Sequence, residues 1–240
     1  MFFTVKKWTL LYILLLLVIF GGFAAIVEQG SEIRTVSAQI RPAAERPVLI
    51  IDAGHGGEDG GAAAADGTRE ADINLTLSLQ MEELAAFLGV ETLLTRREDV
   101  SIHDSGLDTF RARKTSDLKN RAALTASVPN GILVSIHQNK LPGYPTVRGA
   151  QVFYFREKEN DAVLAAAVQE HLNQAVNGQR SKVSKAAGDE IYLLAHAACP
   201  AILVECGFLS NEEETALLRS KAYQTRLTVT ILAGVLSAAS

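Results

Sequence analysis

The chain has 240 residues, a formal net charge of −4 and 48% hydrophobic residues. This composition supplies enough apolar side chain for one packed domain, and the acidic balance excludes the basic patch typical of nucleic-acid binding. The two cysteines, Cys199 and Cys206, are too few for a disulfide framework. An extended strand between them would hold their Cα atoms roughly 20 Å apart, whereas a disulfide needs about 7 Å or less. We therefore expect both thiols to be free.

Residues 1–46 are predicted to lie outside the folded domain. Lys6 and Lys7 precede an uncharged run, 8–27, and Glu28 is the first charge after it. Such a run is long enough to span a bilayer core of about 30 Å, and the charge order places the amino terminus in the cytoplasm. We expect residues 1–29 to be an uncleaved transmembrane anchor, with a cleaved signal segment as the alternative. Residues 30–46 are expected to be a linker, and the protein to be membrane-anchored or secreted, with its catalytic part on the extracytoplasmic side.

From Pro47 onward strand and helix signals alternate, which predicts one α/β domain over residues 47–240. We expect a six-stranded, twisted, largely parallel sheet flanked by helices. The predicted strands are 48–51, 90–95, 132–136, 150–155, 191–194 and 201–204. The predicted helices are 72–88, 116–127, 161–176 and 222–236, with a further helix that begins at Ser210 and carries Glu213 in a capping box. The charged connection 96–114 is expected to be a surface loop.

The sequence DAGHGG directly follows the first predicted strand, and its small residues allow the backbone to turn sharply. His55 thus lies at the carboxyl end of a strand, where open α/β sheets bind ligands. A Gly/Ala-rich loop follows, and Glu70 opens the next helix. The glycines match neither GxxxxGK[ST] nor GxGxxG, and Glu58 and Asp59 would repel a phosphate. A nucleotide site is therefore not expected here.

Three predicted strands end in ionisable residues: His55, His137 and Glu205. If the strands are parallel, the three groups emerge at one edge, and the first loop brings Glu70 to the same place. Two histidines, a ligating carboxylate and a spare carboxylate suit a catalytic Zn²⁺ site with an open position for water. The alternatives are ordinary histidines at strand ends, an acid at a helix start favoured by the dipole, and a glutamate paired with an arginine.

The four motifs DAGHGG, READINL, SIHQN and VECGFLSN resemble the signatures of the zinc-dependent N-acetylmuramoyl-L-alanine amidases of bacterial cell walls. The resemblance covers residues 48 to about 233. It implies that His55, Glu70 and His137 are ligands of Zn²⁺ and that Glu205 is the catalytic glutamate. It also implies a six-stranded sheet and peptidoglycan as the partner and substrate. The bond cut would be the amide between the lactyl group of muramic acid and L-alanine of the stem peptide.

Within that family, SIHQN, RGAQVFY and VECGFLSN are similar to the branch that acts on the spore cortex. Its members strip stem peptides so that muramic acid can become muramic-δ-lactam, which implies a role in sporulation and germination. The short connections 139–148 and 177–190 leave no room for an inserted inhibitory helix. The alternatives are a vegetative cell-wall amidase or autolysin, a zinc peptidase that cuts within the stem peptide, and a catalytically silent wall-binding protein. An accessory protein, if one is needed, is not identified by the sequence.

Four further residues carry weaker expectations. His196 is either a substrate contact or an ordinary loop histidine, and Asn139 either holds its loop or contacts glycan. Asn120 and Arg121 are expected to fix a loop. Strand alternation also predicts that Cys206 points away from the site if Glu205 points over it.

Overall fold

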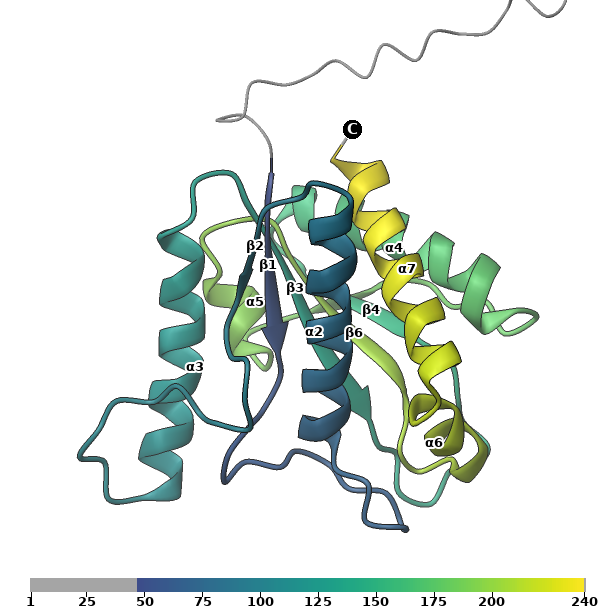
Figure 1. The fold of residues 1–240 in the computed structure, drawn as a ribbon, viewed down its shortest axis with the longest axis horizontal. Helices are drawn as coiled ribbons and strands as arrows, with labels where there is room; N and C mark the ends of the chain where they lie inside the picture. Colours follow the sequence, from purple (N-terminus) through teal and green to yellow (C-terminus); the bar gives the residue numbers. More distant parts are fainter. Residues whose placement is uncertain (1–46, 240) are drawn as a thin grey trace, which may run out of the picture. The chain divides into compact units, whose positions relative to one another are not determined.

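A computed structural model describes residues 47–239, which form an α/β domain around a six-stranded sheet (Figure 1). Its strand order is β2-β1-β3-β6-β4-β5. The strands are β1 (Val48–Ala53), β2 (Thr92–Leu94), β3 (Gly131–Asn139), β4 (Gln151–Phe155), β5 (Lys185–Ala187) and β6 (Ala201–Phe208). β1, β2, β3 and β6 run parallel, whereas β4 is antiparallel to β6. The predicted largely parallel sheet is confirmed, and β1, β3 and β6 end at one common edge.

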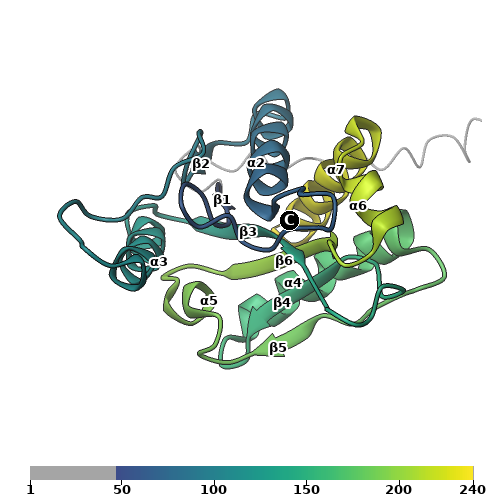
Figure 2. The same ribbon diagram turned by 90° about the horizontal axis from the view of Figure 1, so that it is seen from below.

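Helices cover both faces of the sheet (Figure 2). They are α2 (Glu70–Phe87), α3 (Phe110–Ala126), α4 (Glu159–Leu172), α5 (Tyr192–His196), α6 (Glu212–Leu218) and α7 (Lys221–Ala238), and a π-helical turn, η2 (Asn173–Asn177), extends α4. Buried side chains of α2, α4 and α7 pack together on one face, and those of α3 and α5 pack on the other. The sheet is therefore enclosed on both sides, as expected for parallel strands.

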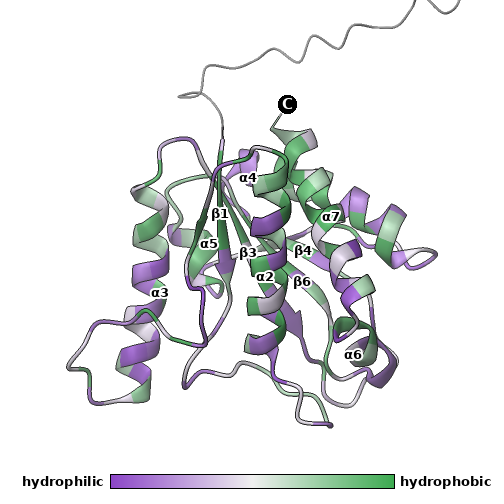
Figure 3. Cartoon of the chain, in the orientation of Figure 1, coloured by the Kyte–Doolittle hydropathy of each residue, from purple (hydrophilic) through white to green (hydrophobic). Residues whose placement is uncertain are grey.

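Alternation along the strands divides the core into two layers. Leu49 and Ile51 of β1 face the layer of α2 and α7, whereas Ile50 faces the layer of α3 and α5. On β6, Val204 and Leu203 divide in the same way. Successive side chains of a strand point to opposite faces, so both faces of each central strand must be apolar. β1 is accordingly hydrophobic in Figure 3, while α3 alternates hydrophilic and hydrophobic turns.

The structure corrects three local expectations. Residues 191–194 are not a strand, because they lie at the start of α5, and the fifth strand is β5, at 185–187. The connection after β2 is shorter than predicted, because α3 begins at Phe110, where the Thr109 side chain accepts a hydrogen bond from the Ala112 amide. The cap of α6 is Asn211, whose side chain accepts from the Glu214 amide, and not Ser210 with Glu213.

The predicted anchor or signal segment 1–29 and linker 30–46 lie outside the described residues. Within residues 47–239, no helix is both long and apolar enough to span a membrane. Both cysteines in this part of the chain are free thiols.

Candidate metal centre

The turn after β1 has an unusual backbone conformation. His55 has a φ of 63°, and Gly56 and Gly57 also have positive φ values. A residue with a Cβ rarely adopts such a φ, and where one does so in a loop it points to a local functional constraint. The turn directs the His55 side chain toward the start of α2.

His55, Glu70 and His137 come together at the carboxyl edge of the sheet. Each offers one ligand atom, and these atoms lie within 4.8 Å of one another. The Glu70 Oε1 atom is 3.2 Å from His55 Nε2 and 2.9 Å from His137 Nδ1. The two imidazole rings meet edge to face, with 4.9 Å between their centroids. The structure thus brings together these three residues, as the sequence predicted.

A second carboxylate orients His55. Asp59 Oδ2 lies 3.0 Å from His55 Nδ1, and it also lies 3.0 Å from the ammonium of Lys114. A carboxylate at Nδ1 favours the tautomer that leaves Nε2 free as a metal ligand. From the sequence, Asp59 is expected only to repel phosphate. Its spacing of four residues from His55 was the available signal for this role.

The ionisation of the cluster follows from these contacts. Burial alone would raise the pKa of Glu70, but hydrogen bonds from His137 and His55 outweigh it and hold the pKa well below its usual range. Burial lowers the pKa of His55, and its contacts with Asp59 and Glu70 reverse this and raise the pKa to about 9. Glu70 is therefore ionised at neutral pH, as a carboxylate ligand must be.

Two glycines make room for the cluster. A Cβ at Gly54 would lie 2.3 Å from His137 Nε2, and a Cβ at Gly61 would lie 2.5 Å from Glu70 Oε2. Since His137 Nε2 packs against Gly54, its Nδ1 is the atom left to face Glu70. Any larger residue at either glycine would displace a proposed ligand.

Two buried guanidinium groups hold the turn that carries His55. Arg121 donates to the carbonyl oxygens of Ala53 and His55, both at 2.8 Å. Arg96 donates to the carbonyl oxygens of Ala53 at 2.9 Å and Gly54 at 3.1 Å. Three consecutive carbonyl groups of the turn are thus fixed from two different elements. We call Arg96 and Arg121 the arginine brace.

Buried carboxylates compensate the charge of Arg121. Arg121 contacts Asp52 Oδ1 and Asp117 Oδ2, each at 2.6 Å. Asp52 also accepts hydrogen bonds from Ser135 at 2.5 Å and Thr95 at 2.8 Å. Burial would raise the pKa of Asp52, but Arg121 and Ser135 keep it below its usual value. The expectation that Arg121 fixes a loop is confirmed. Asn120, which donates to the Ile102 carbonyl, likewise holds the connection before α3.

Glu205 lies beside the cluster without joining it. Its Cα is the register partner of His137 across β3 and β6. Its Oε2 atom is buried and has no hydrogen-bond partner among the described residues. Burial raises the pKa of Glu205 to about 7, and the charges of His137 and Glu70 act in opposite directions on it. A carboxyl with such a pKa can take up and release a proton near neutral pH.

Three nearby residues lie outside the cluster, and strand alternation predicts this for Cys206. Cys206 is fully buried in the core layer of α2, α4 and α7, on the opposite face of β6 from Leu203. His196 ends α5, where its ring stacks on Tyr192 at 3.9 Å between centroids. Asn139 uses its carbonyl to accept from the Leu209 amide at 2.7 Å, which holds its loop.

The donor set fits Zn²⁺. Two imidazole nitrogens, which give up their protons when a metal binds, and one ionised carboxylate are the ligand types of catalytic zinc sites, which keep a further position open for water. Glu205, with its free buried oxygen, lies next to these ligands and not among them. The arrangement can therefore hold a metal through His55, Glu70 and His137, and it leaves one carboxylate available as a base.

Comparison with known proteins gives a consistent result. A family model described as N-acetylmuramoyl-L-alanine amidase matches residues 49–237. The germination-specific N-acetylmuramoyl-L-alanine amidase of Bacillus subtilis is 30% identical over 189 residues, which are 79% of this chain and 78% of that protein. The CwlD amidase from Clostridioides difficile, solved in complex with the GerS lipoprotein, aligns with a TM-score of 0.77 and 36% identity over 80% of this chain and 98% of that one.

A second solved structure, the N-acetylmuramoyl-L-alanine amidase from Clostridium difficile 630, aligns with a TM-score of 0.68 and 27% identity over 80% of this chain and 96% of that one. The family match includes the strands β3 and β6 in full and the whole of α2. It therefore includes the strand ends and the helix start that carry His55, Glu70, His137 and Glu205.

Proposed function

The chain belongs to the N-acetylmuramoyl-L-alanine amidase family and is a peptidoglycan hydrolase, and we propose that it is a zinc-dependent member that matures the spore cortex. The observation that carries the zinc proposal is the convergence of His55, Glu70 and His137 beside the unpartnered Glu205. The proposed bond is the amide between the lactyl group of muramic acid and L-alanine of the stem peptide.

The proposed ligands of Zn²⁺ are His55, Glu70 and His137. Bound there, the ion would supply Lewis acidity toward the amide carbonyl and would acidify a water molecule. Asp59 holds the His55 ring in the required tautomer, and the arginine brace holds its backbone. The chain thus provides the ligands already oriented, which lowers the cost of assembling the site.

Glu205 is the proposed general base and acid. Its free Oε2 would accept a proton from the attacking water as the oxygen bonds to the amide carbon. The same proton would pass to the nitrogen as the carbon–nitrogen bond breaks, which releases a free amine on L-alanine and a carboxylate on the lactyl group. A pKa of about 7 suits both transfers, because neither protonation state is strongly favoured.

The proposed role in the spore cortex rests on two similarities. One relative is named as germination-specific, and the similar CwlD amidase was solved with the GerS lipoprotein. By analogy we propose that this chain also works with an accessory protein. We further propose that residues 1–29 anchor the protein to a membrane, or direct its export, so that the catalytic domain acts outside the cytoplasm.

Product analysis tests the bond that is cut. Purified peptidoglycan is incubated with a protein comprising residues 40–240, and the products are identified by mass spectrometry. We expect free stem peptides with an amino-terminal L-alanine, together with muramic acid that lacks peptide. Shorter stem fragments with peptide left on muramic acid would instead identify a zinc peptidase.

Deletion of the gene tests the biological role. Spores of the deletion strain should contain cortex without muramic-δ-lactam. A normal lactam content together with altered vegetative wall would support the alternative of a vegetative amidase or autolysin.

A further inference from the structure

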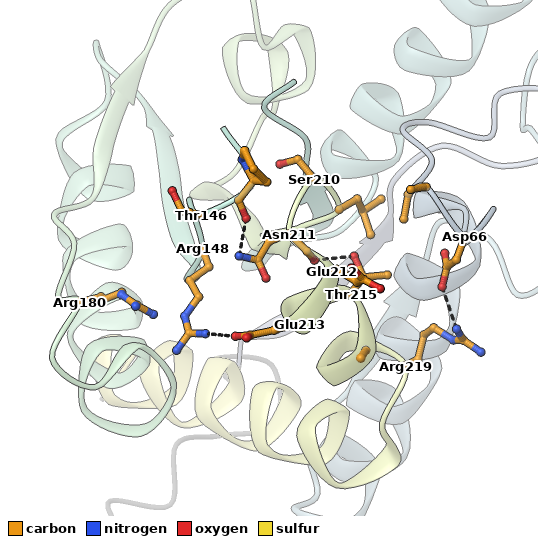
Figure 4. Close-up of a pocket in the computed structure, with 15 residues that line it drawn as sticks. Asp66, Thr146, Arg148, Arg180, Ser210, Asn211, Glu212, Glu213, Thr215 and Arg219 are labelled. Atoms are coloured by element: carbon orange, nitrogen blue, oxygen red, sulfur yellow. Dashed lines mark hydrogen bonds and ion pairs between the residues drawn. The ribbon is translucent and has the colours of Figure 1, made fainter. Parts of the chain in front are cut away.

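A groove with a volume of about 780 Å³ lies beside the catalytic edge (Figure 4). One wall is the loop after β1, at Ala64–Asp66, and another is the loop between β3 and β4, which carries Arg148. The segment from Leu209 to the start of α6 completes it. A cleft of this size holds a ligand of several residues.

Short chain segments connect the groove wall to the proposed metal centre. Leu209, in its wall, follows Glu205 by four residues, so the two are separated by at most roughly 14 Å of extended chain. The Leu209 amide bonds to the carbonyl of Asn139, two residues after His137. On the other side, the Ala62 amide donates to Glu70 Oε2 at 2.7 Å, and the wall residue Ala64 follows shortly after.

Three arginines line the groove together with three acidic residues, Asp66, Glu212 and Glu213. Arg148 pairs with Glu213 and Arg219 with Asp66, both at 2.9 Å. The side chains of Glu213 and Asp66 are 81% and 45% exposed, so these ion pairs are weak and open to exchange. Arg180 extends toward Arg148 in Figure 4, and its guanidinium makes no ion pair or hydrogen bond with residues 47–239.

The groove wall is built from buried polar contacts. Glu214 is 3% exposed, and its carboxylate accepts from the amides of Gly149 and Phe208, both at 2.7 Å. Asn211 caps α6 and donates to the Pro145 carbonyl at 2.7 Å. These bonds tie the Arg148 loop to the end of β6. The loop that carries Arg148 is therefore held in place.

We propose that this groove binds the stem-peptide part of the substrate and that Arg148, Arg180 and Arg219 receive its carboxylates. A peptide that starts at the amide beside Glu205 advances by up to about 3.6 Å per residue. Its first two residues would pass Asn139 and Leu209, and its later residues would reach the arginines. Guanidinium groups bind carboxylates in paired hydrogen bonds, and Arg148 and Arg219 already pair with exposed carboxylates of the groove, so the carboxylates of a stem peptide can take the same places. This inference rests on the proposed function and adds how the substrate is selected.

The test compares two substrates and a matched pair of variants. One substrate is a disaccharide-peptide with free stem carboxylates, and the other is the same molecule with these carboxylates amidated. The variants are the double substitution Arg180→Ala and Arg219→Ala, and the control Arg97→Ala. Arg97 and Arg219 are both ion-paired, and their side chains are 62% and 61% exposed, but Arg97 lies outside the groove.

We expect the wild type and Arg97→Ala to prefer the free carboxylates, as measured by kcat/KM. In the double variant this preference should fall by about 5- to 20-fold, mainly through a higher KM, because the lost contacts are far from the bond that breaks. Calorimetry with the released stem peptide should show a matching loss of affinity. Thermal melts confirm that all variants are folded.

The outcomes separate the two proposals. If the double variant keeps the wild-type preference and the wild-type affinity for the peptide, the groove does not bind the stem, and an acidic partner protein becomes its expected occupant. If the wild type fails to release a peptide from either substrate, the proposed function itself is wrong.

Discussion

Arginine is used in two opposite ways on the two sides of the proposed metal centre. In the brace, Arg96 and Arg121 are 3% and 2% exposed, and they donate to backbone carbonyls and buried carboxylates. In the groove, Arg219 is 61% exposed and has a single ion pair, while Arg180 extends without one in the described residues. The buried guanidinium groups hold the His55 turn in place because their N–H donors are hydrogen-bonded within the protein. The exposed guanidinium groups can bind a ligand because their donors are accessible to it.

The difference has a thermodynamic basis. Burial of a charge is costly unless partners compensate it, and removal of one partner leaves the other uncompensated. An exposed ion pair contributes little, because water and salt screen it. Substitutions in the brace should therefore change stability and metal affinity, whereas substitutions in the groove should change substrate affinity alone.

The largest expected effect is in the brace. Arg121→Met should lower the free energy of unfolding by about 3–5 kcal/mol, because it leaves the buried Asp52 without its guanidinium. It should also weaken Zn²⁺ binding, since the His55 carbonyl loses its donor. Chemical denaturation and metal titration measure the two effects. A loss below about 1 kcal/mol would show that the brace is not what stabilises this edge.

Glu205 is proposed as a base and not as a ligand, so its substitution should leave the metal content unchanged. Glu205→Gln retains size but removes the base, so kcat should fall by at least about 10²-fold. Its neighbour Cys206 faces the core, and Cys206→Ala should cost on the order of 1 kcal/mol of stability and leave kcat near the wild-type value. An active Glu205→Gln variant, or loss of zinc in Cys206→Ala, would overturn the assignment of this strand end.

Asp161 is a buried carboxylate that, unlike Asp52, is not paired with an arginine of the brace. It is 1% exposed, it accepts a hydrogen bond from the Ala201 amide, and its Oδ2 has no partner among the described residues. Burial raises its pKa to about 6, against the effect of the Ala201 amide and Lys158. The folded state therefore favours the neutral acid, and the stability that this gives is present below about pH 4 and is lost as the pH rises through about 6.

Asp161→Asn should remove this pH dependence. Relative to the variant, the wild type should lose on the order of 1 to 3 kcal/mol of unfolding free energy between pH 4 and pH 7. Denaturation curves of both proteins across this range give the difference directly. Parallel stability profiles would mean that Asp161 titrates normally.

The smallest expected effect belongs to the exposed pairs. Arg219→Ala and Arg97→Ala should each change the free energy of unfolding by less than about 1 kcal/mol. Thermal melts at low and high salt measure this. A loss of unfolding free energy as large as that expected for Arg121→Met would contradict the proposed difference between the arginine brace and the groove.

The sequence predicted the parts of the molecule that depend on local pattern. Buried apolar runs located β1, β3 and β6, and their parallel order brought His55, His137 and Glu205 to one edge. Alternation along β6 correctly separated the faces of Glu205 and Cys206. These features follow from period and position alone.

Other features depend on tertiary contacts that a single sequence does not show. The short apolar run 191–194 suits a strand or a helix, and packing against α3 made it part of α5. The real fifth strand, Lys185–Ala187, is itself an edge strand, which pairs only with β4 and carries little apolar signal. Arg96 lay in a segment expected to be a surface loop, yet it is buried under the His55 turn, because its partners are backbone carbonyls distant in sequence.

The most direct test of the central claim is the zinc content of purified wild type, His137→Ala and Glu205→Gln, each incubated with Zn²⁺ and dialysed. His137 is proposed as a ligand and Glu205 as a base beside the metal, although their Cα atoms are register partners on adjacent strands. We expect about one zinc per chain in the wild type and in Glu205→Gln, and a large loss in His137→Ala. Full zinc in His137→Ala, or its loss in Glu205→Gln, would contradict the account.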